Sequence, residues 1–382
     1  MSIKRYLMNI LKIKKPKSLS GKFKFYPNIK QNIKKNIRDL NLKPLYKGDS
    51  FEKSWRQTIK KPKHTLILFC RYQGIPAVYK ALVLNQPASE WGFQRNILIA
   101  KNLAKTLTFS STEVLDYQIK SKNLKYLIHK YFAGRVYSIQ EYNEDILNII
   151  INNLEKWQKS QIPKILRSDG SSKIIGPDGK LYPQNFQLDL KWINFYLQEL
   201  NGLFSNTKEI IEFLKNNSNL VDKNRKYLCH GDFTPVNIIL NKKNRRSHFI
   251  DFEYTRVDHR AWDVANFYFI SWENPEIQTE FVKKYLAKIN NQEEFWQLFR
   301  YQVVFDMTML AYYSLVEISN QFQKNPSRQQ KLKILKYWQK CFWHCEKRLN
   351  QALNRPQDLL KIIDNNQSAH TKFTEKIMME SF

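Results

Sequence analysis

The feature of this sequence that most constrains its fold is a change in the spacing of its hydrophobic residues near position 134. Before that position, short runs of β-branched and aromatic residues alternate with turn signals, a pattern that predicts β-strands. We expect these strands over residues 51–59, 64–72, 77–84, 113–119 and 124–132. A helical spacing interrupts them once, over residues 89–103. The first third of the chain is therefore predicted to be rich in β-structure.

Beyond residue 134 the apolar residues recur at the spacing of α-helices. The longest of these patterns predict helices near residues 293–318 and 328–353. Ser138 and Glu141 have the spacing of a capping box, which predicts that a helix begins there. The second part of the chain is therefore predicted to be mainly helical.

The order of these patterns divides the chain into four parts. Residues 1–40 are a basic N-terminal extension, residues 41–134 a small β-rich lobe, residues 135–353 a larger helical lobe, and residues 354–382 a tail. A stretch with several Gly and Pro residues over 158–186 is expected to be a loop within the larger lobe. We therefore expect an α+β protein with two lobes.

The chain of 382 residues has a formal net charge of +29. Twelve of its Lys and Arg residues lie among the first 40 positions, together with a single acid, Asp39. A positive surface attracts anionic membranes, nucleic acids or anionic substrates. The same excess also arises from compositional drift in a chain that is rich in Asn and Ile. Composition alone leaves both explanations open.

Two further patterns bear on the cellular setting. Ile3, Leu7 and Ile10 lie on one helical face among lysines, so residues 1–15 either lie on an anionic membrane surface or form a basic tail. No apolar run reaches the length that crosses a bilayer. The four cysteines lack the spacing of a disulfide framework, which indicates a reducing compartment. We expect a cytoplasmic protein, peripheral at the inner face of the membrane if residues 1–15 bind it.

The polar residues with a chemical pattern are His230-Gly231-Asp232, Asn237 five residues after that Asp, and Asp251 fourteen residues after the Asn. Asp232 can accept or orient the proton of an attacking hydroxyl group. Asn237 and Asp251 offer hard oxygen ligands, which suit Mg²⁺ bound to nucleotide phosphates. The polar turn over residues 241–246 predicts a hairpin that returns Asp251 to the side of Asn237. A proton acceptor beside two magnesium ligands indicates a phosphotransferase.

These motifs, together with Trp262-Asp263-Val264-Ala265 and the segment over residues 127–135, resemble the aminoglycoside phosphotransferase and choline kinase family. The resemblance runs in order from about residue 45 to residue 350. It implies a bilobed protein-kinase-like fold, in which the β-rich lobe binds the nucleotide and the helical lobe carries the catalytic loop. The cofactors that it implies are ATP or GTP and Mg²⁺.

The resemblance also implies roles for four further residues. Lys80 looks like the strand lysine that grips the α- and β-phosphates. Tyr131 lies in the segment between the lobes, where backbone groups near residues 129–131 would hold the nucleobase. His230 is expected to fix the catalytic loop by hydrogen bonds, and Asp263 is expected to bind the backbone of that loop.

The nucleotide-binding half departs from the family pattern in two places. Where the family has a helix glutamate that pairs with the strand lysine, the best matching position here is Asn96. Either Glu90 pairs with Lys80 through a shifted helix, or this ion pair is missing. The glycine-rich phosphate loop is also degenerate, and Gly48 is its best candidate.

We therefore expect an ATP-dependent kinase that transfers the γ-phosphate to a hydroxyl group of a small alcohol or sugar. The positive net charge disfavours polycationic aminoglycosides and favours an anionic or membrane-linked acceptor, such as a cell-envelope glycan. The degenerate phosphate loop suggests one alternative, an inactive kinase-like scaffold. The basic surface suggests another, a nucleic-acid-binding protein, but no reading motif is present and no specific nucleic-acid partner is expected.

Overall fold

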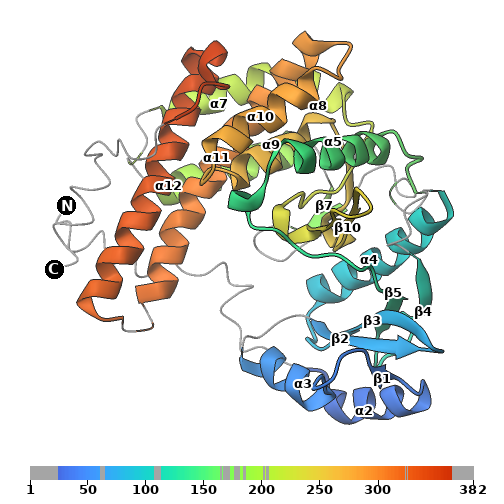
Figure 1. The fold of residues 1–382 in the computed structure, drawn as a ribbon. Coiled ribbons are helices and arrows are strands. Elements are labelled where there is room, and N and C mark those ends of the chain that lie inside the picture. The colour runs from blue at the N-terminus through green and yellow to red at the C-terminus, as the bar shows by residue number, and fades with distance from the viewer. Residues whose placement is uncertain are drawn as a thin grey trace.

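The structure is a computed structural model, and it describes residues 25–60, 65–106, 113–163, 166, 173–175, 181–183, 186–200, 203, 206–322, 324 and 326–363. The expected membrane-binding segment 1–15 and residues 364–382 of the expected tail lie outside the described residues. The described elements form a smaller lobe with a sheet and a larger, mainly helical lobe (Figure 1).

The described part of the smaller lobe contains a five-stranded antiparallel sheet with the order β1-β2-β3-β5-β4. Its strands are β1 (Lys43–Pro44), β2 (Thr65–Tyr72), β3 (Ile75–Leu82), β4 (Val114–Gln118) and β5 (Tyr126–Lys130). β2 and β3 pair along their whole length, from Thr65 opposite Leu82 to Tyr72 opposite Ile75. The turn between them contains Gly74, whose φ of 82° is accessible to glycine at little cost.

Helices cover both faces of this sheet (Figure 1). On one face lie α2 (Ile29–Asp39) and α3 (Phe51–Lys60), which bury Ile33 and Trp55 in a cluster with Tyr79. On the other face lies α4 (Pro87–Thr106), whose Phe93 packs against Leu82. Figure 1 shows α4 between the sheet and the larger lobe. This helix is therefore placed to connect the two lobes.

Two predictions for the smaller lobe are wrong. Residues 51–59, predicted as a strand, form helix α3. Phe51 and Trp55 lie four residues apart and stack with ring centroids 6.0 Å apart, so their spacing has the helical period although their residue types favour strands.

The second error concerns the expected extension over residues 1–40. Phe25 pairs with Leu84, and Ile29 and Ile33 of α2 are buried in the core of the smaller lobe. Residues 25–40 therefore belong to that lobe.

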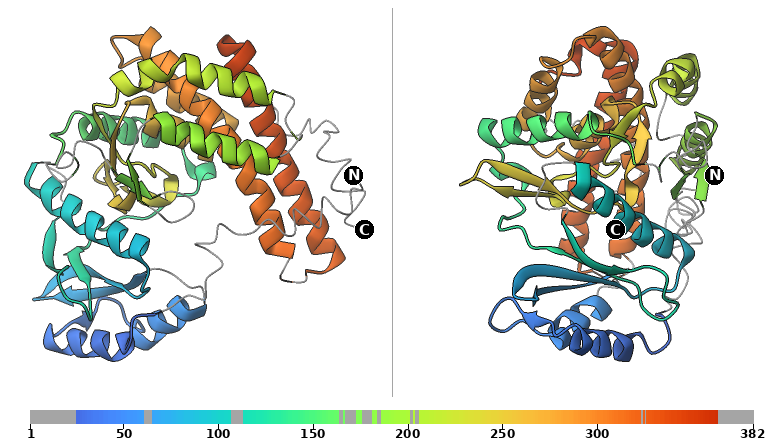
Figure 2. Two further views of the ribbon diagram at one scale, coloured as in Figure 1. Left: turned by 180° about the vertical axis from the view of Figure 1, so that it is seen from behind. Right: turned by 90° about the vertical axis from the view of Figure 1, so that its right-hand side faces the viewer.

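The larger lobe consists mainly of helices (Figure 2). Their buried side chains form one extensive hydrophobic core. Its helices are α5 (Glu144–Gln158), α6 (Phe186–Leu200), α7 (Thr207–Asn216), α8 (Ser218–Lys223), α9 (Ala261–Ile270), α10 (Pro275–Leu286), α11 (Gln292–Phe322) and α12 (Arg328–Asn354). α11 and α12 confirm the two long predicted helices, and they pack against each other. None of the helices in the described residues is long and apolar enough to span a membrane.

Short antiparallel strand pairs lie among these helices. They are β6 (Lys173–Ile175) with β7 (Leu181–Pro183), β8 (Tyr227–Cys229) with β11 (Arg256–Asp258), and β9 (Ile238–Asn241) with β10 (Arg246–Phe249). The first pair falls in the stretch 158–186, which was predicted as a loop. The third pair is the predicted hairpin.

The capping box was predicted to start a helix, but it closes a short 3-10 turn over Ile139–Glu141 instead. The α-helix begins at Glu144, where the side chain of Asn143 accepts a hydrogen bond from Ile146 N at 3.1 Å. A good N-cap residue close downstream therefore decides where the α-helix begins.

The boundary expected at residue 353 lies too early. The buried guanidinium of Arg348 donates to the carbonyl oxygens of Leu359 at 2.7 Å and Lys361 at 3.1 Å. Tyr268 also donates to the carbonyl oxygen of Leu359, at 2.8 Å. The buried guanidinium of Arg348 is thus satisfied by carbonyl groups that follow α12. The chain up to residue 363 therefore packs on the larger lobe.

Candidate active site

The loop that carries Asp232 follows β8, and a buried carboxylate at the start of α9 holds it in place. Asp263 accepts hydrogen bonds from the backbone N–H groups of His230, at 2.8 Å, and Gly231, at 3.0 Å. Gly231 has a φ of +83°, and a Cβ at this position would lie 2.0 Å from the carbonyl oxygen of Tyr254. Glycine is therefore required between His230 and Asp232.

His230 connects the catalytic loop to the segment that leads to Asp251. Its Nε2 lies 2.9 Å from the carbonyl oxygen of Ile250, and its Nδ1 accepts a hydrogen bond from Asp232 N at 3.3 Å. The ring is fully buried, with Phe252 5.7 Å away between centroids. Its position is that of a structural support between the two segments.

Asp232 and Asn237 are joined directly. The amide nitrogen of Asn237 donates to Asp232 Oδ2 at 2.7 Å and to the Asp232 carbonyl oxygen at 3.0 Å. Burial raises the pKa of Asp232, while His230 and the hydrogen bond from Asn237 lower it. Because the amide nitrogen of Asn237 faces Asp232, the amide oxygen is the atom that this residue can offer to a cation.

The hairpin β9–β10 returns the chain to Asn237, as the sequence predicted. Phe249 pairs with Ile238, and Ile250 N donates to the carbonyl oxygen of Asn237 at 3.0 Å. Asp251 follows in the left-handed region, with φ 70° and ψ 66°. A short 3-10 turn over Phe252–Tyr254 comes next.

Lys80 reaches this loop from the sheet of the smaller lobe. Its Nζ lies 3.6 Å from Asp251 Oδ1, and its side chain is largely buried. Glu90 forms its ion pair with Lys125, at 3.0 Å, and accepts a hydrogen bond from Tyr26 at 2.9 Å. The alternative in which Glu90 pairs with Lys80 is therefore wrong, because both oxygens of Glu90 are bound elsewhere in the lobe.

The sheet presents an apolar surface beside Lys80. Ile67 lies opposite Lys80 and Phe69 opposite Val78, so these four side chains share one face. Ile67 and Phe69 are 36% and 44% exposed, which is unusual for large apolar residues next to a core. This face looks toward the larger lobe, because Lys80 contacts Asp251 across the gap.

Tyr131 lies at the rim of the same apolar surface. Its hydroxyl is 2.6 Å from that of Tyr46, and its ring meets Phe69 edge-on with centroids 6.0 Å apart. The N–H of Tyr131 donates to the carbonyl oxygen of Pro76, and that of Lys130 to Glu113. These two amides are bonded within the lobe. That other backbone groups near residues 129–131 hold the nucleobase stays a prediction of the family resemblance.

The region expected to hold the phosphate loop has a different structure. Gly48 has a φ of +86° in a turn before α3, and nothing lies within 4 Å of where its Cβ would be. Between β1 and β2 the chain forms helix α3 on the sheet face opposite Lys80. The described residues thus contain no tight glycine hairpin that joins these two strands.

Sequence reasoning gave no role to Glu253, which belongs to the site. Burial, helped by the charges of Asp251 and Asp232 and opposed by Lys80, raises the pKa of Glu253 to about 7. Tyr254 is 42% exposed, and burial and the carboxylates of Glu253, Asp232 and Asp251 raise the pKa of its phenol. The Asp-Phe-Glu spacing, which puts two acids two residues apart, is the signal that could have identified Glu253.

The available oxygen atoms suit a magnesium ion. Asn237 offers an amide oxygen, and Asp251 and Glu253 offer carboxylates, which are the ligand types that Mg²⁺ prefers. Burial is the main cause of the raised pKa of Glu253, and the charges of Asp251 and Asp232 add to it, so a bound cation would favour the ionised carboxylate. Within the described part of the chain no cluster of three or more His, Cys, Asp or Glu residues forms a metal cage. The set therefore fits an ion that takes its other ligands from nucleotide phosphates and water.

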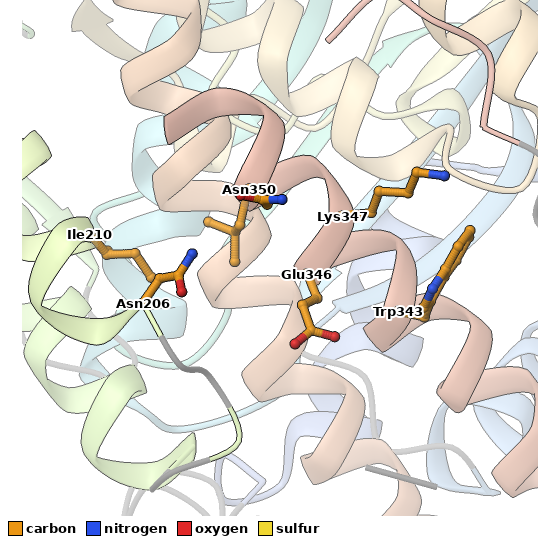
Figure 3. A pocket seen from close by; sticks show the side chains of 7 residues that line it. Asn206, Ile210, Trp343, Glu346, Lys347 and Asn350 are labelled. Atoms are coloured by element: carbon orange, nitrogen blue, oxygen red, sulfur yellow. The ribbon is translucent and has the colours of Figure 1, made fainter. Parts of the chain in front are cut away.

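A separate hollow of about 490 Å³ lies between α7 and α12 (Figure 3). It is lined by Asn206, Ile210, Trp343, Glu346, Lys347, Leu349 and Asn350. None of these residues belongs to the group around Asp232. This hollow is therefore distinct from the candidate active site.

The fold and this group of residues define a class of proteins. A family model described as the phosphotransferase enzyme family matches residues 100–297. That range is just over half of the chain, and the chain belongs to this phosphotransferase enzyme family.

Solved structures confirm the bilobed protein-kinase-like fold. Aminoglycoside phosphotransferase APH(4)-Ia is 14% identical with a TM-score of 0.53, over 85% of this chain and 98% of that chain. The GDP complex of aminoglycoside 2'-phosphotransferase-IIIa is 9% identical with a TM-score of 0.50, over 83% and 99%. At these identities the likeness concerns the fold alone.

Among curated proteins, a probable ethanolamine kinase B of Dictyostelium discoideum is 39% identical over 72 residues. The match spans 16% of this chain and 16% of that protein.

Proposed function

We propose that the protein is a kinase that transfers the γ-phosphate of ATP or GTP to a hydroxyl group of a small, positively charged alcohol. One observation carries the proposal: Lys80 of the smaller lobe and Asp232, Asn237 and Asp251 of the larger lobe meet through a continuous set of contacts. Phosphoryl transfer needs mainly this kind of positioning and charge compensation.

Asp232 takes the role of the proton acceptor. Its carboxylate is half-buried at the surface of the loop, and Asn237 binds only one of its oxygens in the described structure. The second oxygen can accept the hydroxyl proton of the acceptor as its oxygen bonds to the γ-phosphorus, while the bond from that phosphorus to the bridging oxygen breaks and the nucleoside diphosphate leaves. Asp263 and His230 act by holding the backbone on either side of this carboxylate.

Asn237, Asp251 and Glu253 would hold Mg²⁺. The ion, when bound, compensates the charge of the nucleotide phosphates. Lys80 already contacts Asp251, so it lies where the α- and β-phosphates would come between the lobes. Family membership and the GDP complex of the aminoglycoside 2'-phosphotransferase-IIIa support a nucleotide at this place.

The apolar face beside Lys80 would bind the nucleobase. Ile67, Phe69 and Val78 supply a flat apolar surface, and Tyr131 closes its rim. Stacking on such a surface does not require the amides of Lys130 and Tyr131, which are bonded within the lobe.

The local charge of the site favours a cationic acceptor. Asp232, Asp251 and Glu253 all raise the pKa of the partly exposed Tyr254 phenol, in addition to burial, so their negative field extends to this ring. Carboxylates beside an aromatic ring bind ammonium groups well. This local field opposes the net charge of +29, which had favoured an anionic glycan. The ethanolamine kinase relative supports an amino alcohol.

The proposal is tested with the purified full chain, labelled ATP or GTP and Mg²⁺. We expect labelled product with ethanolamine or choline, at rates at least about tenfold above those with glucose or glucuronate, as one ion-paired contact gives. Faster transfer to glucuronate would overturn the cationic acceptor. No transfer to any acceptor, together with no Mg²⁺-dependent shift in Tm with ADP, would leave the inactive scaffold as the better account.

A further inference from the structure

Helix α4 lacks the acid that would reach the phosphate-binding lysine. Its one acid is Glu90. The Oε2 atom of Glu90 accepts a hydrogen bond from Tyr26 at 2.9 Å, and its Oε1 lies 3.0 Å from Lys125 Nζ and 3.2 Å from Gln94 Nε2. Both carboxylate oxygens of Glu90 are thus bound near the start of α4, by residues of the smaller lobe. Glu90 therefore secures α4 to its own lobe and has no role at Asp251.

Asn96, further along the same helix, contacts the loop that would hold the metal. Only 6% of Asn96 is exposed. Its amide nitrogen donates to Asp251 Oδ1 at 3.3 Å, and its amide oxygen accepts from Phe252 N at 3.4 Å. One side chain thus binds both the carboxylate of Asp251 and the peptide that follows it.

The two contacts of Asn96 hold the backbone that follows Asp251 and orient the Asp251 carboxylate. The backbone of Asp251 lies in the left-handed region, which is unfavourable for any residue with a Cβ. The bond to Phe252 N holds the peptide on the far side of this bend. Lys80 and Asn96 both bind Asp251 Oδ1. Oδ2 is then the oxygen that Asp251 can turn toward a metal.

A second contact from the same helix supports this arrangement. Arg95 donates to the carbonyl oxygen of Thr255, directly after the 3-10 turn, and its guanidinium lies 4.6 Å from the ring of Trp91. Arg95 and Asn96 therefore hold the two ends of the turn that follows Asp251. The position of α4 is thereby coupled to the position of the Asp251 carboxylate.

We propose that Asn96 is the positioning residue that orients Asp251 toward the metal, in place of an ion pair between a helix acid and Lys80. An amide suits this position because it donates to a carboxylate and accepts from a peptide without adding charge. A carboxylate at the same place would lie about one hydrogen-bond length from Asp251, where two like charges repel. It would also compete with Asp251 for Lys80.

This inference rests on the proposed function, because it needs a metal–nucleotide complex at Asp251. The test uses the full chain and measures Mn²⁺ binding in the presence of ADP by electron paramagnetic resonance, without turnover. Asn96→Leu removes both hydrogen bonds while it keeps a side chain of the same branched shape, and Asn96→Ala serves if the leucine variant does not fold. Gln94→Met is the matched control, because it removes an amide from the same helix whose bond is to Glu90.

We expect Asn96→Leu to weaken Mn²⁺ binding to the ADP complex by about tenfold, as loss of a partner of a metal ligand does. Binding of ADP without metal and the KM of the acceptor should stay within about twofold, and Gln94→Met should match the wild type. Wild-type Mn²⁺ affinity in Asn96→Leu, or an equal loss in Gln94→Met, would overturn the role of Asn96. A wild-type protein that binds no Mn²⁺ with ADP would instead overturn the proposed function.

Discussion

In the larger lobe, the side chains at the centre of the site are held by a short chain of hydrogen bonds: Asp263 to the loop backbone, Asn237 to Asp232, and His230 to Ile250. In the smaller lobe, the surface that would grip the nucleotide consists of Lys80 and the apolar side chains beside it on the sheet, and α3 lies on the opposite face. The part that performs chemistry tolerates little change in geometry, because it must meet a reacting hydroxyl group. The part that binds phosphates and a base can reach the same end by different contacts.

The largest loss of phosphate transfer is expected when Asp251, a proposed metal ligand of the larger lobe, is changed. Asp251→Asn keeps the shape of the side chain but removes its charge. We expect at least about a hundredfold loss of phosphate transfer, since charge compensation at the phosphates is worth several kcal/mol. Mg²⁺-dependent ADP binding should weaken in parallel, as measured by titration calorimetry. Unchanged ADP binding would remove Asp251 from the metal site.

A smaller loss is expected when the support of the loop is removed. Asp263→Asn leaves an amide that cannot accept from the N–H groups of both His230 and Gly231. We expect kcat to fall by about 10- to 100-fold and Tm to drop by a few degrees, with the KM of the nucleotide nearly unchanged. Steady-state kinetics and thermal melts measure both effects. If KM rises while kcat is preserved, the loop does not depend on Asp263 in this way.

The acids of the site also predict a pH dependence. Because burial raises the pKa of Glu253 to about 7, this carboxyl group is mostly protonated at pH 6 and mostly ionised at pH 8. We expect Mg²⁺-dependent ADP binding to weaken by about tenfold between pH 8 and pH 6, and Glu253→Gln to remove most of this change.

The same shift has a consequence for stability without metal. The folded-state pKa of Glu253 lies above the unfolded value, so its neutral form adds stability at low pH that is lost as the pH rises through about 7. The Tm of the metal-free protein should therefore fall between pH 5 and pH 8, and fall less in Glu253→Gln. An equal fall in both proteins would show that Glu253 titrates near its ordinary pKa.

The smallest effect on kcat is expected from a change of Glu90, the acid of helix α4. Glu90→Gln breaks the ion pair with Lys125, which is 6% exposed, and should lower Tm by a few degrees. It should leave kcat within about twofold, because Lys80 contacts Asp251 and not Glu90. A large loss of kcat with a normal Tm would restore the conventional pairing of Glu90 with Lys80.

The sequence predicted the parts of this molecule that depend on local patterns. Residue order and periodicity predicted the β9–β10 hairpin and the helices α11 and α12. The spacing of three polar residues in the sequence pointed to the site, namely Asp232, Asn237 and Asp251. Family resemblance supplied the bilobed fold. These features are local, or they are so specific in type and spacing that few alternatives exist.

Other features could not be predicted because tertiary contacts decide them. Residues 51–59 have the composition of a strand, but they form a helix that packs on the sheet and buries Trp55 there. Asn96 was recognised only as the place of a missing acid, and its contacts with Asp251 and Phe252 join residues more than 150 positions apart. Nothing in the sequence near Asn96 signals such a pairing.

Asp232→Asn gives the most direct test of the central claim. Phosphate transfer and Mg²⁺-dependent ADP binding are measured on the same preparation of this variant and of the wild type. If Asp232 is the proton acceptor, transfer should fall by about 10²–10⁴-fold, as loss of a general base does, while the affinity for Mg²⁺–ADP stays within about twofold. Transfer that survives in Asp232→Asn at the wild-type rate would contradict the account.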